Sequence, residues 1–337
     1  MSDAGEPTTE PTEPSELAED LAQFAHEPVM ATEIVELFTP VPAGWVLDAT
    51  LGGAGHATRL LEAHPHLNVL GLDRDGDALA VAQERLTRFG ARIATAHLRF
   101  DHLEQAMDAL AIDHLSGALF DLGVSSPQLD RTERGFSYRN DAPIDMRMDR
   151  SDPWTAADIV NGYDEPSLVR VLRDYGDERF AVRIARAIVA ARPIETTNRL
   201  AEVVVGAIPA AARRTGGHPA KRTFQALRIE LNGELEVLPG ALDTAIARTA
   251  VGGRVAVLSY HSGEDRIVKE RMRFAQTGGC ECPPELPCVC DALQTVRLVR
   301  APRTPSASEQ SSNPRARSAR LRVVERIVPR RRPDGGR

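Results

Sequence analysis

The chain has 337 residues and a net charge of −7, and 42% of its residues are hydrophobic and 26% charged. These values are typical of a soluble globular protein with one large domain or two coupled ones. No apolar run approaches the ~18 residues that a membrane helix needs, so the composition excludes a transmembrane protein.

The N-terminal segment differs from the rest of the chain. Residues 1–27 carry eight Asp and Glu residues and no Lys or Arg, and residues 1–25 are rich in Pro, Glu, Thr and Ser. Such a segment cannot bury enough apolar surface to offset its ordering entropy, so we expect a disordered acidic tail over residues 1–25. It also lacks the features of a secretory signal or a transit peptide, and we expect a cytoplasmic protein.

From residue 26 onward, short apolar runs alternate with amphipathic stretches. The pattern predicts helices over residues 28–38, 56–63, 77–89 and 102–110, and strands over residues 45–49, 68–73, 93–97 and 117–122. Strands and helices in regular turn are typical of βαβ units, in which a parallel sheet is covered on both faces. The sequence therefore predicts an α/β fold.

This rhythm stops after residue 122. Residues 123–153 are rich in Ser, Pro, Asp, Arg and Gly and have no period, which indicates a long ordered or functional loop. Helical patterns then follow without strands between them, at residues 165–175, 178–191 and 200–208. We therefore expect an inserted helical substrate domain over residues 125–222.

The α/β pattern resumes after the insertion. A helical region over residues 223–250 is expected to break at Gly233 and Pro239, and a strand at 253–260 and a helix at 263–274 follow it. Two late runs, at residues 295–299 and 319–328, are expected to pair as antiparallel edge strands. Residues 26–124 and 223–328 together form the expected main domain.

The C-terminal part of the chain is basic. Residues 297–337 carry twelve Arg against three acidic residues. Such a segment either binds phosphates or is a solvated tail, and charge alone leaves both interpretations open. We expect residues 329–337 to form a basic tail. The arginines expected to contact phosphates are Arg315, Arg317, Arg320, Arg322, Arg330, Arg331 and Arg332.

A glycine-rich turn follows the first predicted strand, in Val46-Leu-Asp-Ala-Thr-Leu-Gly-Gly-Ala-Gly-His56. Its glycines allow the backbone to approach a ligand closely, although a merely tight turn has the same pattern. The turn lacks the P-loop and dinucleotide patterns, which favours a smaller adenosine-bearing ligand. Asp73 ends the next strand, where a carboxylate accepts hydrogen bonds from both hydroxyls of a ribose. A helix N-cap is the alternative role for Asp73.

A second polar segment follows the fourth predicted strand. Asp121 ends that strand at the ligand-binding edge of an open sheet. The tetrapeptide Ser125-Ser126-Pro127-Gln128 is similar to the Asp/Asn/Ser-Pro-Pro-aromatic loop of amino-methyltransferases. Acceptors in such a loop bind the N–H groups of a base amine and pull its nitrogen toward a tetrahedral, nucleophilic geometry. Taken alone, the tetrapeptide indicates an ordinary Ser-Pro turn.

Several stretches combine into a more specific pattern. They are His26-Glu-Pro-Val-Met30, Asp121-Leu-Gly-Val-Ser-Ser-Pro-Gln-Leu-Asp130, Arg134-Gly-Phe-Ser137, Asp145-Met-Arg-Met-Asp149, Tyr175-Gly-Asp-Glu-Arg-Phe180, Arg222-Thr-Phe-Gln-Ala-Leu-Arg-Ile229, Ser259-Tyr-His-Ser-Gly-Glu-Asp-Arg-Ile-Val-Lys269 and Asn313-Pro-Arg-Ala-Arg-Ser318. In chain order, from about residue 26 to 328, the sequence resembles the RsmH/MraW family of bacterial 16S rRNA cytosine-N4 methyltransferases.

The resemblance implies a Rossmann-like class I methyltransferase sheet with an inserted helical domain. It implies S-adenosylmethionine (S-adenosyl-L-methionine) as cofactor and a decoding-centre cytidine of 16S ribosomal RNA as substrate, within the small ribosomal subunit. By position, it implies cofactor contacts at Ala54, Gly55, His56, Asp73, Phe100, Asp121 and Gln128, and a catalytic site at Asp121, Ser126 and Pro127.

Some of these positions have alternative roles. Phe100 suits stacking on adenine or packing in the core, and His56 either contacts the cofactor or caps its helix. The sequence departs from the family at Ala54, where some relatives have Gly, and at Gly263, where Leu is more usual. The first departure adds only a methyl group.

Other polar residues also have two possible roles. His261 suits removal of the proton from the methylated amine, and loss of that proton to water is the alternative. Asp145, Arg147 and Asp149 either shape the substrate pocket or fix the long loop by ion pairs, and we favour the second role.

The four cysteines of the chain lie together at Cys280, Cys282, Cys288 and Cys290. Four thiolates suit a tetrahedral zinc ion, but Cys-x-Cys pairs are shorter than the usual Cys-x₂-Cys spacing and strain a chelate. Reduced free thiols are therefore favoured over a zinc site, a redox pair is the third alternative, and no metal is predicted.

Two other functions compete with rRNA methylation. A DNA or protein-amide methyltransferase uses the same kind of proline-containing loop, and a non-catalytic RNA-binding assembly factor keeps only the fold. A homodimer is left open, and no membrane partner is expected.

Overall fold

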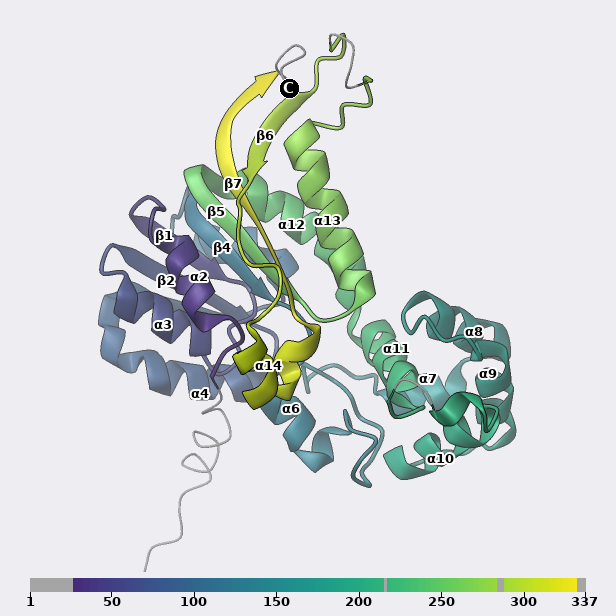
Figure 1. Ribbon diagram of the computed structural model, residues 1–337. Coiled ribbons are helices and arrows are strands. Elements are labelled where there is room, and N and C mark those ends of the chain that lie inside the picture. The colour runs from purple at the N-terminus through teal and green to yellow at the C-terminus, as the bar shows by residue number, and fades with distance from the viewer. Residues whose placement is uncertain (1–26, 215–216, 284–287, 332–337) are drawn as a thin grey trace, which may run out of the picture.

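The computed structural model describes residues 27–214, 217–283 and 288–331. A twisted sheet is covered by helices, and a group of helices from the middle of the chain lies beside it (Figure 1). The expected acidic tail at residues 1–25 lies outside the described residues. Among the described helices, none has the length and apolar character needed to cross a membrane.

The first half of the main domain follows the predicted alternation. Its elements are α2 (Ala31–Phe38), β1 (Gly44–Asp48), α3 (Gly55–Ala63), β2 (Leu67–Asp73), α4 (Gly76–Leu86), β3 (Ile93–His97), α5 (Leu103–Ala109) and β4 (Leu115–Asp121). β1 pairs in parallel with β2 and β4, and β2 pairs in parallel with β3. The predicted parallel βαβ arrangement is therefore confirmed.

The second half completes the sheet. Its elements are α11 (Lys221–Asn232), α12 (Glu234–Arg248), β5 (Thr249–Ser259), α13 (Ser262–Thr277), β6 (Leu293–Leu298), α14 (Ala307–Ser312) and β7 (Arg320–Arg331). β5 is parallel to β4, whereas β7 is antiparallel to β5 and β6. The strand order is β3-β2-β1-β4-β5-β7-β6, which confirms the Rossmann-like class I methyltransferase sheet.

The C-terminal hairpin differs from its prediction in two respects. β6 and β7 pair as expected. Of these two strands, however, only β6 lies at an edge of the sheet, because β7 lies between β5 and β6. β7 also extends to Arg331, so that Arg330 and Arg331 pair with β6 and do not belong to a tail. The prediction ended this strand at residue 328 because the apolar residues end there. Arg332 lies outside the described residues.

The break expected at Pro239 is absent. Gly233 ends α11 with φ of 61°, as predicted, but Pro239 lies inside α12. A proline in a helix removes one backbone hydrogen bond. α12 buries Leu238 and Leu242 on either side of the proline, and we attribute the continuity of the helix to this packing.

The central strand β4 shows how the sheet is buried on both faces. Leu119 packs into a cluster with Phe38 of α2, while Phe120 packs into the opposite cluster with Leu242 of α12. Successive side chains of a strand point to opposite faces, so an uninterrupted apolar strand is covered by helices on both sides. Asp121 follows at the point where β4 leaves this core.

The insertion contains α7 (Ala156–Gly162), α8 (Glu165–Asp174), α9 (Ala181–Ala190) and α10 (Thr197–Ala207). These helices lie beside the sheet (Figure 1) and have a core of their own, which includes Ile184 and Leu200. Phe224 and Leu227 of α11 belong to the same core, so α11 straddles the predicted boundary at residue 222. The helices predicted as α8, α9 and α10 are confirmed, whereas α7 was missed.

The end of α11 fixes the long loop that precedes the insertion. The side-chain amide of Asn232 accepts a hydrogen bond from the Met148 backbone and donates one to the Met146 carbonyl, both at 2.9 Å. Arg74, just beyond β2, donates to the Asn232 carbonyl at 2.7 Å. One residue thus connects the loop, the insertion and the edge of the sheet.

Candidate functional site

Three carboxylates converge at the carboxyl edge of the parallel strands. Asp48 ends β1, Asp73 ends β2 and Asp121 ends β4. Connections leave β1 in one direction and β4 in the other, and ligands of open α/β sheets bind outside such a switch point. Asp48 was missed in the sequence, although it directly precedes the glycine-rich turn.

Burial is the main influence on all three carboxyl groups. It raises the pKa of Asp48 to about 7, and repulsion from Asp121 and Asp73 adds to this rise while a backbone hydrogen bond from Thr50 opposes it. Burial likewise raises the pKa of Asp73 and of Asp121 to about 6. Buried negative charge of this density favours a cationic ligand.

Asp73 joins the glycine-rich turn to the end of β2. One carboxylate oxygen accepts from the Gly52 N–H at 2.6 Å and the other from the Asp75 N–H at 2.8 Å. The N-cap of α4 is Asp75, whose side chain accepts from the Asp77 N–H. The capping alternative for Asp73 is therefore wrong, and the predicted ribose contact stays a prediction.

The turn itself depends on backbone conformation. Ala54 is buried and has φ of 61°, in the left-handed region that favours glycine, so conformation matters more at this position than the added methyl group. A side chain at Gly55 would approach Pro28 within 3.2 Å. Gly55 thus permits close packing of the segment before α2.

His56 is buried at the start of α3 without capping it. The N-cap is Ala54, which excludes the capping alternative for His56. Neither ring nitrogen has a hydrogen-bond partner among the described residues, and Nε2 lies 3.7 Å from the Asp121 carboxylate. Burial lowers the pKa of His56 to about 4, so the ring is neutral at pH 7. Its unsatisfied nitrogens suit a ligand at this edge.

Asp121 is held in place from two sides. The Tyr260 hydroxyl donates to its Oδ1 at 2.6 Å, and its backbone N–H donates to the Thr50 hydroxyl at 2.7 Å. Burial and the neighbouring Asp121 charge raise the pKa of Tyr260 above its ordinary value, so Tyr260 remains a donor. Tyr260 was missed as a site residue even though it lies within a recognised stretch.

His261 is the N-cap of α13. Its Nδ1 accepts from the Glu264 N–H at 3.4 Å, and its Nε2 lies 3.1 Å from the Glu264 carboxylate. Burial acts to raise the pKa of Glu264, but His261 and Arg228 outweigh it and lower the pKa. Nδ1 thus accepts from the Glu264 backbone while Nε2 is buried without a hydrogen-bond partner among the described residues, and the general-base role of His261 stays a prediction.

The loop after β4 folds back onto the end of β2. Ser126 and Pro127 begin the short helix α6 (Ser126–Asp130). The buried Gln128 accepts from the Ser125 N–H at 3.0 Å and donates to Asp75 at 2.8 Å, so its amide orients the loop. The hydroxyl of Ser125 is buried without a partner among the described residues. That orphaned hydroxyl suits a polar group of a ligand.

Phe100 and the residues 145–149 also lie near the ends of β2 and β3. Phe100 packs edge-on against Phe120 at 5.7 Å between ring centroids but is only partly buried, so its contact with adenine stays a prediction. Arg147 pairs with Asp145 at 2.8 Å inside the long loop, as favoured. Asp149 lines a cavity of about 310 Å³ beside them.

Two other predicted groups lie apart from these carboxylates. The four cysteines occupy the loop between α13 and β6. Among the C-terminal arginines, Arg315 pairs with Asp130 at 2.9 Å and Arg322 with Asp265 at 2.6 Å. These two arginines stabilise the fold, which weakens the prediction that they contact phosphates, whereas Arg330 at the end of β7 is exposed.

Comparison with known proteins identifies the family. The model of the MraW methylase family matches residues 23–327. A ribosomal RNA small subunit methyltransferase H from Thermobifida fusca is 53% identical, covering 90% of this chain and 93% of that protein. A protein of the same name from Saccharopolyspora erythraea is 51% identical, covering 91% and 94%.

A solved rRNA methylase structure from Streptococcus thermophilus gives a TM-score of 0.37 at 12% identity, covering 88% of this chain and 94% of that one, and we draw nothing from it. The match to the family model and the identity to the two relatives extend over nearly all of the main domain and the insertion. The chain belongs to the MraW methylase family.

Proposed function

We propose that this member of the MraW methylase family methylates the N4 amine of a cytidine in the decoding centre of 16S rRNA, within the small ribosomal subunit. S-adenosylmethionine is the methyl donor. The observation that carries the proposal is the position of Asp121 and its loop directly beside the carboxylate-lined turn at the β1–β4 switch point.

The residues at this edge fit the proposed cofactor. Asp48 is buried and Asp73 and Asp121 are half-buried, none of the three forms an ion pair with Lys or Arg among the described residues, and the cofactor has a sulfonium and an ammonium group. Asp73 binds the ribose hydroxyls through the remaining lone pairs of its two oxygens. His56 and Ser125 have unused polar atoms for further contacts. When bound, the cofactor supplies an already activated methyl group.

The loop after β4 orients the base. Asp121 accepts a hydrogen bond from the cytosine amine, and Tyr260 keeps the carboxylate in place for it. Ser126 and Pro127 present the loop backbone to the same amine, while Gln128 holds the loop on Asp75. The chain's contribution is thus mainly positioning, which brings nitrogen and methyl group to reacting distance.

The insertion and the basic C-terminal part of the chain, residues 297–337, hold the RNA. A cytosine in folded RNA has to be splayed out before its amine reaches a pocket, and contacts to the flanking nucleotides stabilise that state. The insertion has a hydrophobic core of its own. Its helices therefore form a firm surface against which the flanking RNA binds.

Nucleoside mass spectrometry of 16S rRNA tests the proposal. A strain that lacks the gene should lose N4-methylation at one cytidine, and the wild-type gene should restore it, whereas an Asp121→Ala gene should not. A 16S rRNA with unchanged nucleosides would contradict the proposal. Methylated DNA or protein amide in its place would support the rival transferase, and a chain that binds no S-adenosylmethionine would support an assembly factor.

A further inference from the structure

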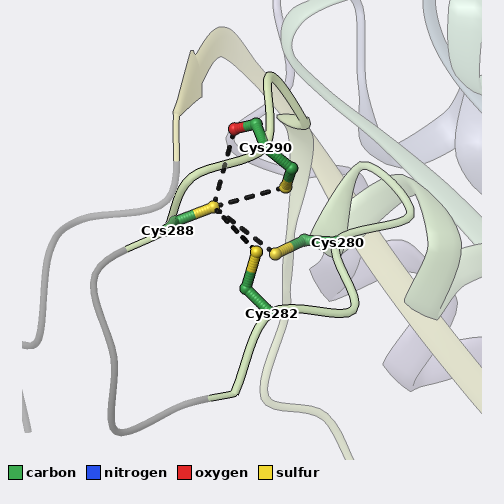
Figure 2. Close-up of side chains that lie close together, drawn as sticks. All are labelled: Cys280, Cys282, Cys288 and Cys290. Atoms are coloured by element: carbon green, nitrogen blue, oxygen red, sulfur yellow. Dashed lines mark hydrogen bonds between the residues drawn. The ribbon is translucent and has the colours of Figure 1, made fainter.

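Four cysteine side chains point toward one another on the loop between α13 and β6 (Figure 2). The sulfur of Cys288 lies 3.5 Å from that of Cys280, 3.9 Å from that of Cys282 and 3.4 Å from that of Cys290. All four sulfurs lie within 4.8 Å of one another. The methyl-transfer site does not use this cluster, which occupies the opposite edge of the sheet.

The spacing of the sulfurs matches a tetrahedral metal site. Zinc binds thiolate sulfur at about 2.3 Å, which places the four sulfurs of a tetrahedron about 3.8 Å apart. The separations around Cys288, 3.4 to 3.9 Å, bracket that value. They are far longer than the ~2.05 Å of a disulfide bond, and none of the four cysteines is in a disulfide. The two Cys-x-Cys pairs therefore reach one centre in spite of their short spacing.

The backbone before the cluster is shaped to bring the first pair inward. Gly278 and Gly279 have φ of 63° and 73°, and a side chain on Gly278 would come within 2.4 Å of the Leu293 carbonyl oxygen. The Cys280 N–H then donates to the Thr277 carbonyl at 3.2 Å. This turn packs the loop against the first residue of β6, so the position of Cys280 is set by the fold.

The four sulfurs converge although the loop does not bury them. Cys288 contacts three other sulfurs at once, and all four side chains are partly exposed, so their convergence does not result from packing into a hydrophobic core.

We propose that Cys280, Cys282, Cys288 and Cys290 bind one structural Zn²⁺ ion. The four S–H groups lose their protons to solvent as four Zn–S bonds form, and nothing is oxidised or reduced. With four protein ligands the ion has no open position, so it is structural and takes no part in methyl transfer. It fixes the loop next to Leu293, which pairs with Arg331 at the end of the β6–β7 hairpin.

Cobalt titration of the full-length, metal-stripped protein tests this site independently of methylation. Co²⁺ alone should give the visible absorption of a tetrahedral thiolate complex, saturating at one equivalent, and Zn²⁺ should abolish that absorption by displacement. Protein purified without chelators should contain about one equivalent of zinc by elemental analysis. Because the titration uses the unaltered chain, it decides the matter even if a cysteine variant fails to fold.

A matched pair of variants locates the ion. Cys282→Ser should bind Co²⁺ more than about 100-fold more weakly, since it removes one of four thiolate ligands. Val289→Ser introduces the same side chain between two of the cysteines, at a position that is 90% exposed, and should bind Co²⁺ normally. Equal loss in both variants would overturn the proposal. So would four freely titratable thiols with no cobalt spectrum, or a disulfide in a protein that binds no cobalt.

Discussion

The polar groups at the carboxyl ends of the parallel strands differ in environment from those at the opposite end of the sheet. At the carboxyl edge, the buried Asp48 and the half-buried Asp73 and Asp121 have raised pKa values, and the nitrogens of His56 lack hydrogen-bond partners among the described residues. At the opposite edge, the cysteines are partly exposed and contact one another. Buried polar groups without partners destabilise a fold. In the first region, polar atoms without protein partners indicate a ligand. In the second region, the indication is four sulfur atoms that already converge.

The largest effect is expected at Asp121. We expect Asp121→Ala to reduce methyl transfer by at least ~100-fold, because the amine loses its acceptor, while RNA affinity changes little. Single-turnover methylation and RNA binding, measured in parallel, check this. Pro127→Ala should act in the same direction with a smaller loss. Asp113→Ala, on the exposed loop between α5 and β4, is the control. Full turnover in both site variants would place the catalytic loop elsewhere.

The Asp48→Asn variant should change how the free energy of unfolding depends on pH. Its folded-state pKa of about 7 lies above the ordinary value of 3.8, so the folded state binds the proton more tightly and loses stability as pH rises through this window. At pH 7.5, without cofactor, the neutral Asn should raise the free energy of unfolding by on the order of 3 kcal/mol, and the gain should shrink by about half at pH 5.

Chemical denaturation at both pH values measures this gain. Asp291→Asn removes an exposed carboxylate and should change stability by less than ~0.5 kcal/mol at either pH. A gain for Asp48→Asn that is equal at pH 5 and pH 7.5 would show that its carboxyl group is not held protonated in the fold.

The smallest effect is expected at the end of β7. Arg330→Gln combined with Arg331→Gln should lower the salt slope of log K for RNA by roughly 0.7 to 0.9 per lost phosphate contact. Both side chains are exposed, so stability should change little. Cofactor affinity should stay constant. An unaltered salt slope would mean that RNA is held by the insertion and that these arginines serve the hairpin alone.

Periodicity was sufficient to predict most of the fold. It indicated the parallel strands and the inserted helices because burial on two faces or on one stripe leaves a regular pattern. It missed α7 and α14, which are too short to show one. It also ended β7 too early, because the exposed Arg330 and Arg331 have no apolar neighbours to mark the strand.

The site was predicted less completely than the fold. Asp73 and Asp121 follow strands, a position that can be inferred from sequence. Tyr260 contacts Asp121 across 139 residues of chain, and Asp48 is notable only because two other carboxylates lie near it in space. The convergence of the four cysteines could not be inferred from their spacing, because it depends on the turn that Gly278 and Gly279 form before Cys280.

Calorimetric titration with S-adenosylmethionine tests the central claim, that the carboxyl edge of the sheet is the cofactor site. Asp73→Ala should weaken binding by about 10- to 100-fold or more, because each hydrogen bond to a charged group contributes roughly 1.5–3 kcal/mol. Its circular dichroism should match that of the wild type, and Asp291→Ala should bind normally. Unchanged affinity in a folded Asp73→Ala protein would contradict the account, since Asp73 would then serve only to hold the Gly52 turn.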